Sequence, residues 1–176
     1  MSDMIKQDLM ERLMRLDEDA SLLFPDDCRF HLIIVGGSAL ILLEVISRAT
    51  HDIDALDASG EIRGLLERYD INCRVQTYIN NFPYNYEDRL QPIPLQGRKI
   101  DFFTASLEDI VIAKLYSFRD SDQRDIESEE VRKALDWALL EQLATEPDEA
   151  RASSLNERNY RDFKQNYDEY VRRFRP

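Results

Sequence analysis

The sequence has 176 residues, of which 43% are hydrophobic and 33% are charged, and its formal net charge is −12 at pH 7. This length suits one domain, or one domain with a helical extension, and this composition excludes a disordered chain. The acidic balance argues against broad, nonspecific binding of nucleic acids, which requires a basic surface.

The N-terminal region predicts a helix and carries no targeting pattern. Ser2 and Asp3 are placed to cap this helix, whose apolar residues recur at helical spacing as far as Leu16. The region lacks the basic and apolar parts of a signal peptide, and no apolar run approaches the roughly 20 residues that cross a bilayer. We therefore expect a cytoplasmic protein that has no membrane partner and carries Cys28 and Cys73 as free thiols.

After this helix, the pattern predicts alternating strands and helices, followed by helices only. The continuous apolar run at 30–35 is typical of a buried strand, and two prolines limit 89–95 to an edge strand at most. The remaining expected elements, in chain order, are a helix at 38–47, a strand at 52–56, a helix at 61–69, a strand or extended segment at 73–79, a loop at 80–88, a strand at 98–105, a helix at 107–119 capped by Ser106, a loop at 120–125, a helix at 129–144 capped by Ser128 and a last helix at 155–174.

This order predicts an α/β (α+β) fold, in which a small mixed sheet is flanked by helices and further helices follow at the C-terminal end. We expect residues 1–126 to form the α/β core and residues 127–176 to form a helical part packed on it. Residues 151–176 hold seven basic and four acidic side chains, a net charge of +3, which leaves −15 on the rest. Such a segment contacts a polyanion or the acidic body, or is a solvated helix face.

Gly36, Gly37 and Ser38 stand where the first strand turns into a helix. Backbone N–H groups at a helix start attract anions, and glycine lets a bulky phosphate approach the backbone. The Ser38 hydroxyl would add a donor. A tight structural turn explains the same residues, so the turn alone does not assign a phosphate site.

Asp52 and Asp54 lie in the next expected strand, with Ile53 between them. Alternate residues of a strand face the same side, so the two carboxylates project together while Ile53 enters the core. Two carboxylates on one face repel unless a cation lies between them, and Mg²⁺ accepts carboxylate oxygens together with substrate phosphates. A solvated strand end is the structural alternative. By the same alternation, His51 points away from this face.

Asp101 is a lone acid inside an otherwise apolar strand, where an acid seldom occurs without a partner. We expect it on the strand beside Asp52 and Asp54, pointing to the same face, because Ile100 and Phe102 flank it. Three converging carboxylates would complete a two-metal site. The alternative is a charge on an edge strand.

This residue set resembles the DNA polymerase β-like nucleotidyltransferase superfamily, whose pattern is an apolar residue, Gly, Gly or Ser, a spacer of about a dozen residues and Asp-apolar-Asp. Here the pattern reads Val35 to Ser38 and then Asp52 to Asp54. The stretch "SRATHDIDAL" is similar to the Arg-x-Thr-x-Asp-apolar-Asp form of small bacterial members, which include toxin-type enzymes of abortive-infection systems. "SLEDIVIAKLYSFRDSDQRDI" resembles the helix that follows the third carboxylate in those members, and the match covers residues 30 to 126.

The resemblance implies a role for each matched residue. Gly36, Gly37 and Ser38 would form the nucleotide-binding turn, with the last two holding the β- and γ-phosphates. Asp52 and Asp54 would bind two Mg²⁺ ions, Asp101 would bind the catalytic ion and act as base, and Lys114 would neutralise phosphate charge. Lys114 lies among apolar residues, where an unpaired cation is costly, although a lysine with its charge at the surface is the alternative. Asp125 is a weaker candidate, as a structural partner for a nearby arginine.

The resulting expectation is a Mg²⁺-dependent enzyme that moves a nucleoside monophosphate from a triphosphate such as ATP to an acceptor hydroxyl. The expected acceptor is an RNA such as tRNA, or a protein. The resemblance also implies that the enzyme acts as a toxin that has an antitoxin partner. Three alternatives stay open: a non-catalytic, antitoxin-like binding protein with the same fold, an adenylyltransferase that modifies small-molecule antibiotics, and a metal-dependent phosphohydrolase.

Overall fold

The computed structural model describes residues 4–56 and 58–176, without the side chains of 75–77. Their internal contacts divide them into two compact units. Unit 1 comprises the described residues of Met1–Gln76 and Leu90–Ala105, and unit 2 comprises Thr77–Arg89 and Ser106–Pro176. This division differs from the expected boundary after residue 126, because the apolar helix at Leu107–Ser117 packs against later helices of unit 2.

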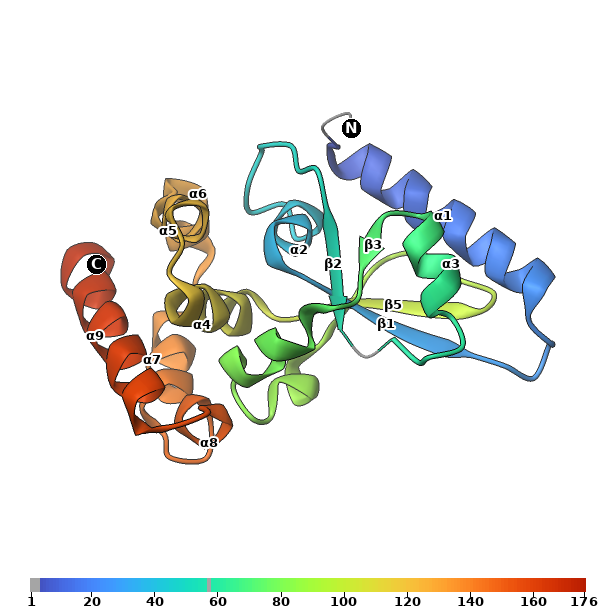
Figure 1. Cartoon of the computed structure of the whole chain (residues 1–176). Coiled ribbons are helices and arrows are strands. Elements are labelled where there is room, and N and C mark those ends of the chain that lie inside the picture. Colours follow the sequence, from blue (N-terminus) through green and yellow to red (C-terminus); the bar gives the residue numbers. More distant parts are fainter. Residues whose placement is uncertain (1–3, 57) are drawn as a thin grey trace. The chain divides into compact units, whose positions relative to one another are not determined.

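Unit 1 is built around a mixed sheet of five strands within the described residues (Figure 1). Its elements, in chain order, are α1 (Lys6–Leu23), β1 (Phe30–Val35), α2 (Gly36–Leu42), β2 (Ile53–Leu56), α3 (Arg63–Arg68), β3 (Ile71–Asn72), β4 (Gln91–Pro92) and β5 (Ile100–Thr104). The strand order is β3-β2-β1-β5-β4, with β1 antiparallel to β2 and parallel to β5. The predicted small mixed sheet flanked by helices is therefore confirmed.

The two faces of the sheet differ in burial. The face that carries Leu32, Ile34, Ile53, Ala55 and Phe102 is buried throughout, which explains the continuous apolar runs of these strands. The opposite face is more open, because it carries the exposed His31 and the half-buried Asp54, Asp101 and Phe103. Alternation along each strand places these side chains together on one side of the sheet.

Unit 2 contains 3-10 turns at its start and helices thereafter. Within the described residues, these are the second part of Val75–Asn81, the turn at Tyr86–Arg89, and α4 (Leu107–Ser117), α5 (Asp120–Glu127), α6 (Glu129–Ala134), α7 (Trp137–Thr145), α8 (Ala150–Ser153) and α9 (Glu157–Phe174). Ser106 caps α4 by accepting a hydrogen bond from the backbone N–H of Asp109, as expected. The aromatic residues Phe163, Tyr167 and Tyr170 of α9 are buried.

Several expected elements are wrong in type or length. The strand or extended segment expected at 73–79 is wrong, because β3 ends at Asn72, before this range, and Val75–Asn81 is a 3-10 helix. The Asn72 side chain accepts a hydrogen bond from the N–H of Arg74 and turns the chain. The loop expected at 120–125 is the helix α5, and the helix expected at 129–144 is broken at Asp136, which caps α7. The predicted caps Ser2 and Asp3 lie outside the described residues.

In the part of the chain that the structure describes, no helix is both long enough and apolar enough to cross a bilayer.

Candidate functional site

The turn from β1 into α2 lies directly against the Asp54 side chain. Val35 ends β1 and Gly36 is already the first residue of α2, so no loop separates strand and helix. Gly36 has a φ of +68°, a conformation that residues with a side chain rarely adopt. A Cβ atom at Gly36 would also lie only 3.2 Å from Oδ2 of Asp54. The backbone conformation therefore favours glycine at this position, and a side chain would also require the Asp54 carboxylate to shift by a few tenths of an ångström.

Asp52 and Asp54 flank the buried Ile53 at the start of β2. Asp54 lies in the strand opposite Val35 and is half-buried, whereas Asp52 precedes the strand and is exposed. The side chain of Ile53 is 1% exposed on the covered face of the sheet. The structure thus brings the glycine turn and Asp54 together, and Asp52 and His51 are exposed just before β2.

Asn72 is a further residue of this site, and the sequence reasoning missed it. It lies on β3 opposite Asp54, and its Nδ2 donates a hydrogen bond of 3.0 Å to Asp54 Oδ1. The side-chain oxygen Oδ1 of Asn72 accepts a hydrogen bond from the backbone N–H of Arg74, and this bond fixes the orientation of the side-chain amide. The signal was available, because a strand that follows a helix after β2 usually returns beside β2.

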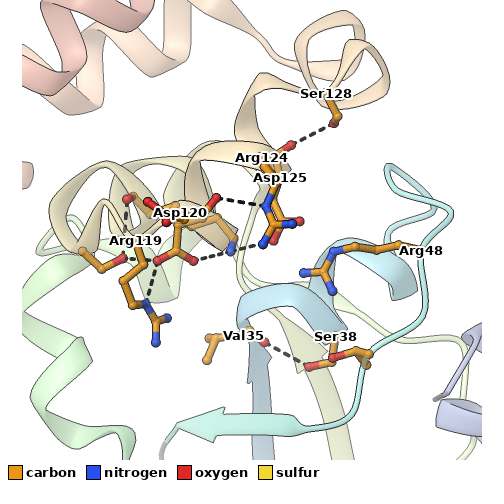
Figure 2. Close-up of polar contacts among 12 residues, drawn as sticks. Val35, Ser38, Arg48, Arg119, Asp120, Arg124, Asp125 and Ser128 are labelled. Atoms are coloured by element: carbon orange, nitrogen blue, oxygen red, sulfur yellow. Dashed lines mark hydrogen bonds and ion pairs between the residues drawn. The ribbon is translucent and has the colours of Figure 1, made fainter.

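The side chains of Ser38 and Arg48 lie at the start of α2 (Figure 2). Ser38 is 2% exposed, and its hydroxyl donates a 3.1 Å hydrogen bond to the Val35 carbonyl oxygen. The hydroxyl therefore points into the protein. Arg48 comes from the segment between α2 and β2, and its Nη2 would be 2.7 Å from a Cβ atom at Gly37.

Asp101 does not lie where the sequence reasoning expected it. Its strand β5 pairs with β1, so β1 separates it from β2, and the expected adjacency is wrong. Along β1, Asp101 is opposite His31 whereas Asp54 is opposite Val35. Four residues along a strand and two strand spacings separate their Cα atoms by roughly 16 Å. The expected sheet face is correct, but the two residues lie toward opposite ends of β1.

The Asp101 carboxylate has an ion pair with Arg29. Arg29 donates from Nη2 to Oδ1 and from Nε to Oδ2, the latter over 3.2 Å. These hydrogen bonds lower the pKa of Asp101 below its ordinary value. Among the described residues, no group of three or more His, Cys, Asp or Glu side chains is arranged to hold a metal ion. The expected convergence of three carboxylates is therefore absent from this part of the chain.

Lys114 belongs to unit 2, where its charge is compensated by two buried carboxylates. Its Nζ donates to Asp122 Oδ1 over 2.7 Å and to Asp125 Oδ2 over 3.0 Å. Burial opposes ionisation of Asp122, but the Lys114 charge and the hydrogen bonds from Lys114, Arg119 and Ser117 outweigh it and lower the pKa of Asp122. Lys114 is 6% exposed, so it is not the surface lysine considered as an alternative, and Asp125 has a structural ion pair.

The comparisons with known proteins agree with this combination of fold and turn. The family model described as "Nucleotidyltransferase of unknown function (DUF6036)" matches residues 11–175, a span that includes the glycine turn, the aspartate pair and most of both units. No curated protein and no solved structure matches the sequence. Because the family model covers nearly the whole chain, the chain belongs to this nucleotidyltransferase family.

Proposed function

We propose that the chain is a Mg²⁺-dependent nucleotidyltransferase that transfers a nucleoside monophosphate from a nucleoside triphosphate to an acceptor hydroxyl. One observation carries the proposal: the Gly36 backbone approaches the Asp54 carboxylate so closely that a Cβ atom would lie 3.2 Å from Oδ2. A turn suited to phosphate and a carboxylate suited to a cation are thus neighbours. Membership of a nucleotidyltransferase family supports the same activity.

The residues at this site fit Mg²⁺. Asp52 and Asp54 offer carboxylate oxygens, and Mg²⁺ in nucleotide sites is usually held by one or two carboxylates together with substrate phosphates. Asp52 and Asp54 would therefore hold the ion. When bound, the ion would neutralise the charge of the phosphates. Asn72 keeps the Asp54 carboxylate oriented through its 3.0 Å hydrogen bond. The expectation of two ions now rests on Asp52 and Asp54 alone.

The protein's contribution to the reaction is mainly positioning. The glycine turn admits the phosphate chain to the backbone, and the N–H groups of the first turn of α2 face the incoming phosphates. Asp52 and Asp54 would hold the Mg²⁺ that neutralises the charge of the α-phosphate. The acceptor hydroxyl oxygen then bonds to the α-phosphorus and its proton passes to water, while the bond from that phosphorus to the bridging oxygen breaks and pyrophosphate leaves.

For the acceptor, we place the hydroxyl of an RNA first. The support is the net charge of +3 on residues 151–176, most of which belong to α9. Some of this charge is used in pairs within the helix, such as Lys164 with Asp168 and Arg172 with Glu169. The toxin role is a further part of this proposal and rests on the sequence resemblance alone; it predicts that expression of the chain without a partner stops growth.

A second candidate is a non-catalytic nucleotide-binding protein with this fold. The observation that favours it is the position of Asp101, which leaves two carboxylates at the glycine turn and assigns no base. The two functions make different predictions, because a binding protein would bind the triphosphate with Mg²⁺ but would not release pyrophosphate.

Transfer can be tested with the purified protein, Mg²⁺, each of the four triphosphates labelled at the α-phosphate, and either total RNA or a protein lysate. We expect label in RNA and expect Asp54→Asn to abolish it, while Asp101→Asn retains it. Label in protein would correct the acceptor. Triphosphate binding without label in any species would favour the second candidate.

A further inference from the structure

Unit 2 has an open groove where α4 ends beside α9. The two helices pack against each other within this unit (Figure 1). The groove has a volume of about 1010 Å³, and it is lined by Phe118 at the C-terminal end of α4 and by polar and charged residues of α9. Clefts that bind ligands reach roughly this size. None of the residues that line the groove has a role in the nucleotide site proposed above.

Phe118 has a backbone conformation that is unfavourable for a residue with a side chain. Its φ is +46° and its ψ is +36°, the left-handed region in which a helix commonly ends with glycine or asparagine. The other described residues besides glycine that have a positive φ are Glu44 and Asp70, which are both polar. The ring of Phe118 is half-buried, and it contacts no other aromatic ring and no cation in the described ranges. The chain thus keeps an aromatic ring in the groove where glycine would be less strained.

Arg161 is the cation of the groove that no acid compensates. Each acid that lines the groove pairs with a basic residue: Glu157 with Arg151, Asp168 with Lys164 and Glu169 with Arg172. Arg161 is exposed, and within the described part of the chain it has neither a hydrogen bond nor an ion pair. The groove therefore combines an unused guanidinium with an aromatic ring.

We propose that this groove binds single-stranded RNA, with an unpaired base stacked on Phe118 and a backbone phosphate on Arg161. The inference rests on the proposed function, because it gives the RNA acceptor a binding site. Proteins bind single strands through cations that contact phosphates and through aromatic rings on which bases stack. An acidic peptide would use the cation alone, so the ring favours RNA. A single local groove also agrees with the net charge of −12, which argues only against broad binding.

Fluorescence anisotropy with the full chain and a labelled single-stranded oligoribonucleotide measures this binding without any transfer. We expect Phe118→Leu to weaken binding by about 5-fold or more, the scale of one lost stacking contact, and Phe118→Tyr to stay within about 2-fold of the wild type. Arg161→Met should weaken binding and reduce the slope of log affinity against log salt concentration by about 0.7, the value for one phosphate contact on a single strand. Phe118→Leu should leave this slope unchanged, because it removes no charge.

Arg158→Met is the matched control for the loss of one positive charge. Arg158 is exposed on the same helix, pairs with Asp162 and does not line the groove, so its variant should keep both the affinity and the slope. Circular dichroism confirms that each variant is folded, and Arg161→Met tests the site even if the Phe118 variants do not fold. Equal losses for Arg158→Met and Arg161→Met, or no binding by the wild type, would overturn the inference. Displacement of the RNA by polyglutamate as readily as by unlabelled RNA would overturn it in favour of an acidic protein partner.

This inference and the proposed function fail in different ways. If the wild type binds the oligoribonucleotide as predicted but transfers no label, the proposed function fails and the RNA groove stands. If label enters RNA while all these variants bind it as the wild type does, the groove assignment fails and the proposed function stands.

Discussion

Gly36 lies beside the Asp54 side chain where β1 ends: a Cβ atom on Gly36 would lie 3.2 Å from Asp54 Oδ2 and 4.0 Å from its Cβ. The antiparallel pairing of β1 with β2 produces this contact, because Asp54 is opposite Val35, the residue before Gly36. The phosphate-type turn and the metal-type carboxylate are therefore not independent features. A change at one of them alters the other.

We expect Gly36→Ala to lower the free energy of unfolding by about 1–2 kcal/mol, because alanine is strained at positive φ. The new methyl group also pushes the Asp54 carboxylate aside, so Mg²⁺ affinity should fall. Gly64→Ala is the matched control: Gly64 lies in α3, and a Cβ atom there meets nothing within 4 Å. That variant should be more stable by roughly 0.5–1 kcal/mol. Urea unfolding of both variants measures the difference, and equal stabilities would contradict the strain at Gly36.

Asp101→Asn should leave the binding of Mg²⁺ and triphosphate within about 2-fold of the wild type, since roughly 16 Å of sheet separates Asp101 from Asp54. The substitution should weaken the pair with Arg29 and lower the unfolding midpoint only slightly, because the pair is solvent-exposed. Titration calorimetry and a thermal melt check both statements. A loss of transfer beyond 100-fold in a folded variant would restore Asp101 to the active site.

Lys114→Met should lower the free energy of unfolding by about 3–5 kcal/mol, because it leaves the carboxylates of Asp122 and Asp125 buried without their shared cation. The control is Lys133→Met. Lys133 forms an exposed pair with Glu129, and its loss should not measurably change stability. Chemical denaturation measures the free energy of unfolding of both variants. Similar values for the two would show that the buried cluster contributes nothing to stability.

The same cluster should make stability depend on pH in the acid range. The folded-state pKa of Asp122 lies below the ordinary 3.8, so the unfolded chain binds a proton first as the pH falls. The stabilising contribution is then complete above about pH 4 and is lost as the pH falls from 3.8 through the lower folded value. Asp122→Asn should be less stable than the wild type at pH 7, and the gap should narrow below pH 4. A gap that stays constant from pH 7 to pH 3 would refute this assignment.

The pattern of residues predicted the parts of the fold that local chemistry determines. The apolar run at 30–35, the glycine turn and the Ser106 cap are local features, and the structure has each of them. The helix α5 was missed because its buried face is polar: Asp122 and Asp125 point to Lys114, so the periodicity of apolar residues is lost. Charged partners brought together by folding are invisible to a hydropathy pattern.

The candidate site was predictable only in part, for a similar reason. Alternation along the strands gave the correct face for Asp101. Its distance from Asp54, however, depends on which strands are neighbours and on their register, and neither can be read from the residues of β5 alone. Asn72 was missed because the extended segment was expected to begin at residue 73, which left the residue opposite Asp54 outside it. Its role appears once β3 pairs with β2.

The most direct test of the central claim is the calorimetric titration of ATP into the protein with Mg²⁺ and again with EDTA, for the wild type and for Asp54→Asn. The account predicts that the wild type binds at least about 10-fold more tightly with Mg²⁺, because Asp52 and Asp54 repel an unneutralised triphosphate. It also predicts that Asp54→Asn loses this difference while remaining folded. Equal affinity with Mg²⁺ and with EDTA in the wild type, or an undiminished Mg²⁺ effect in Asp54→Asn, would contradict a nucleotide site at the glycine turn.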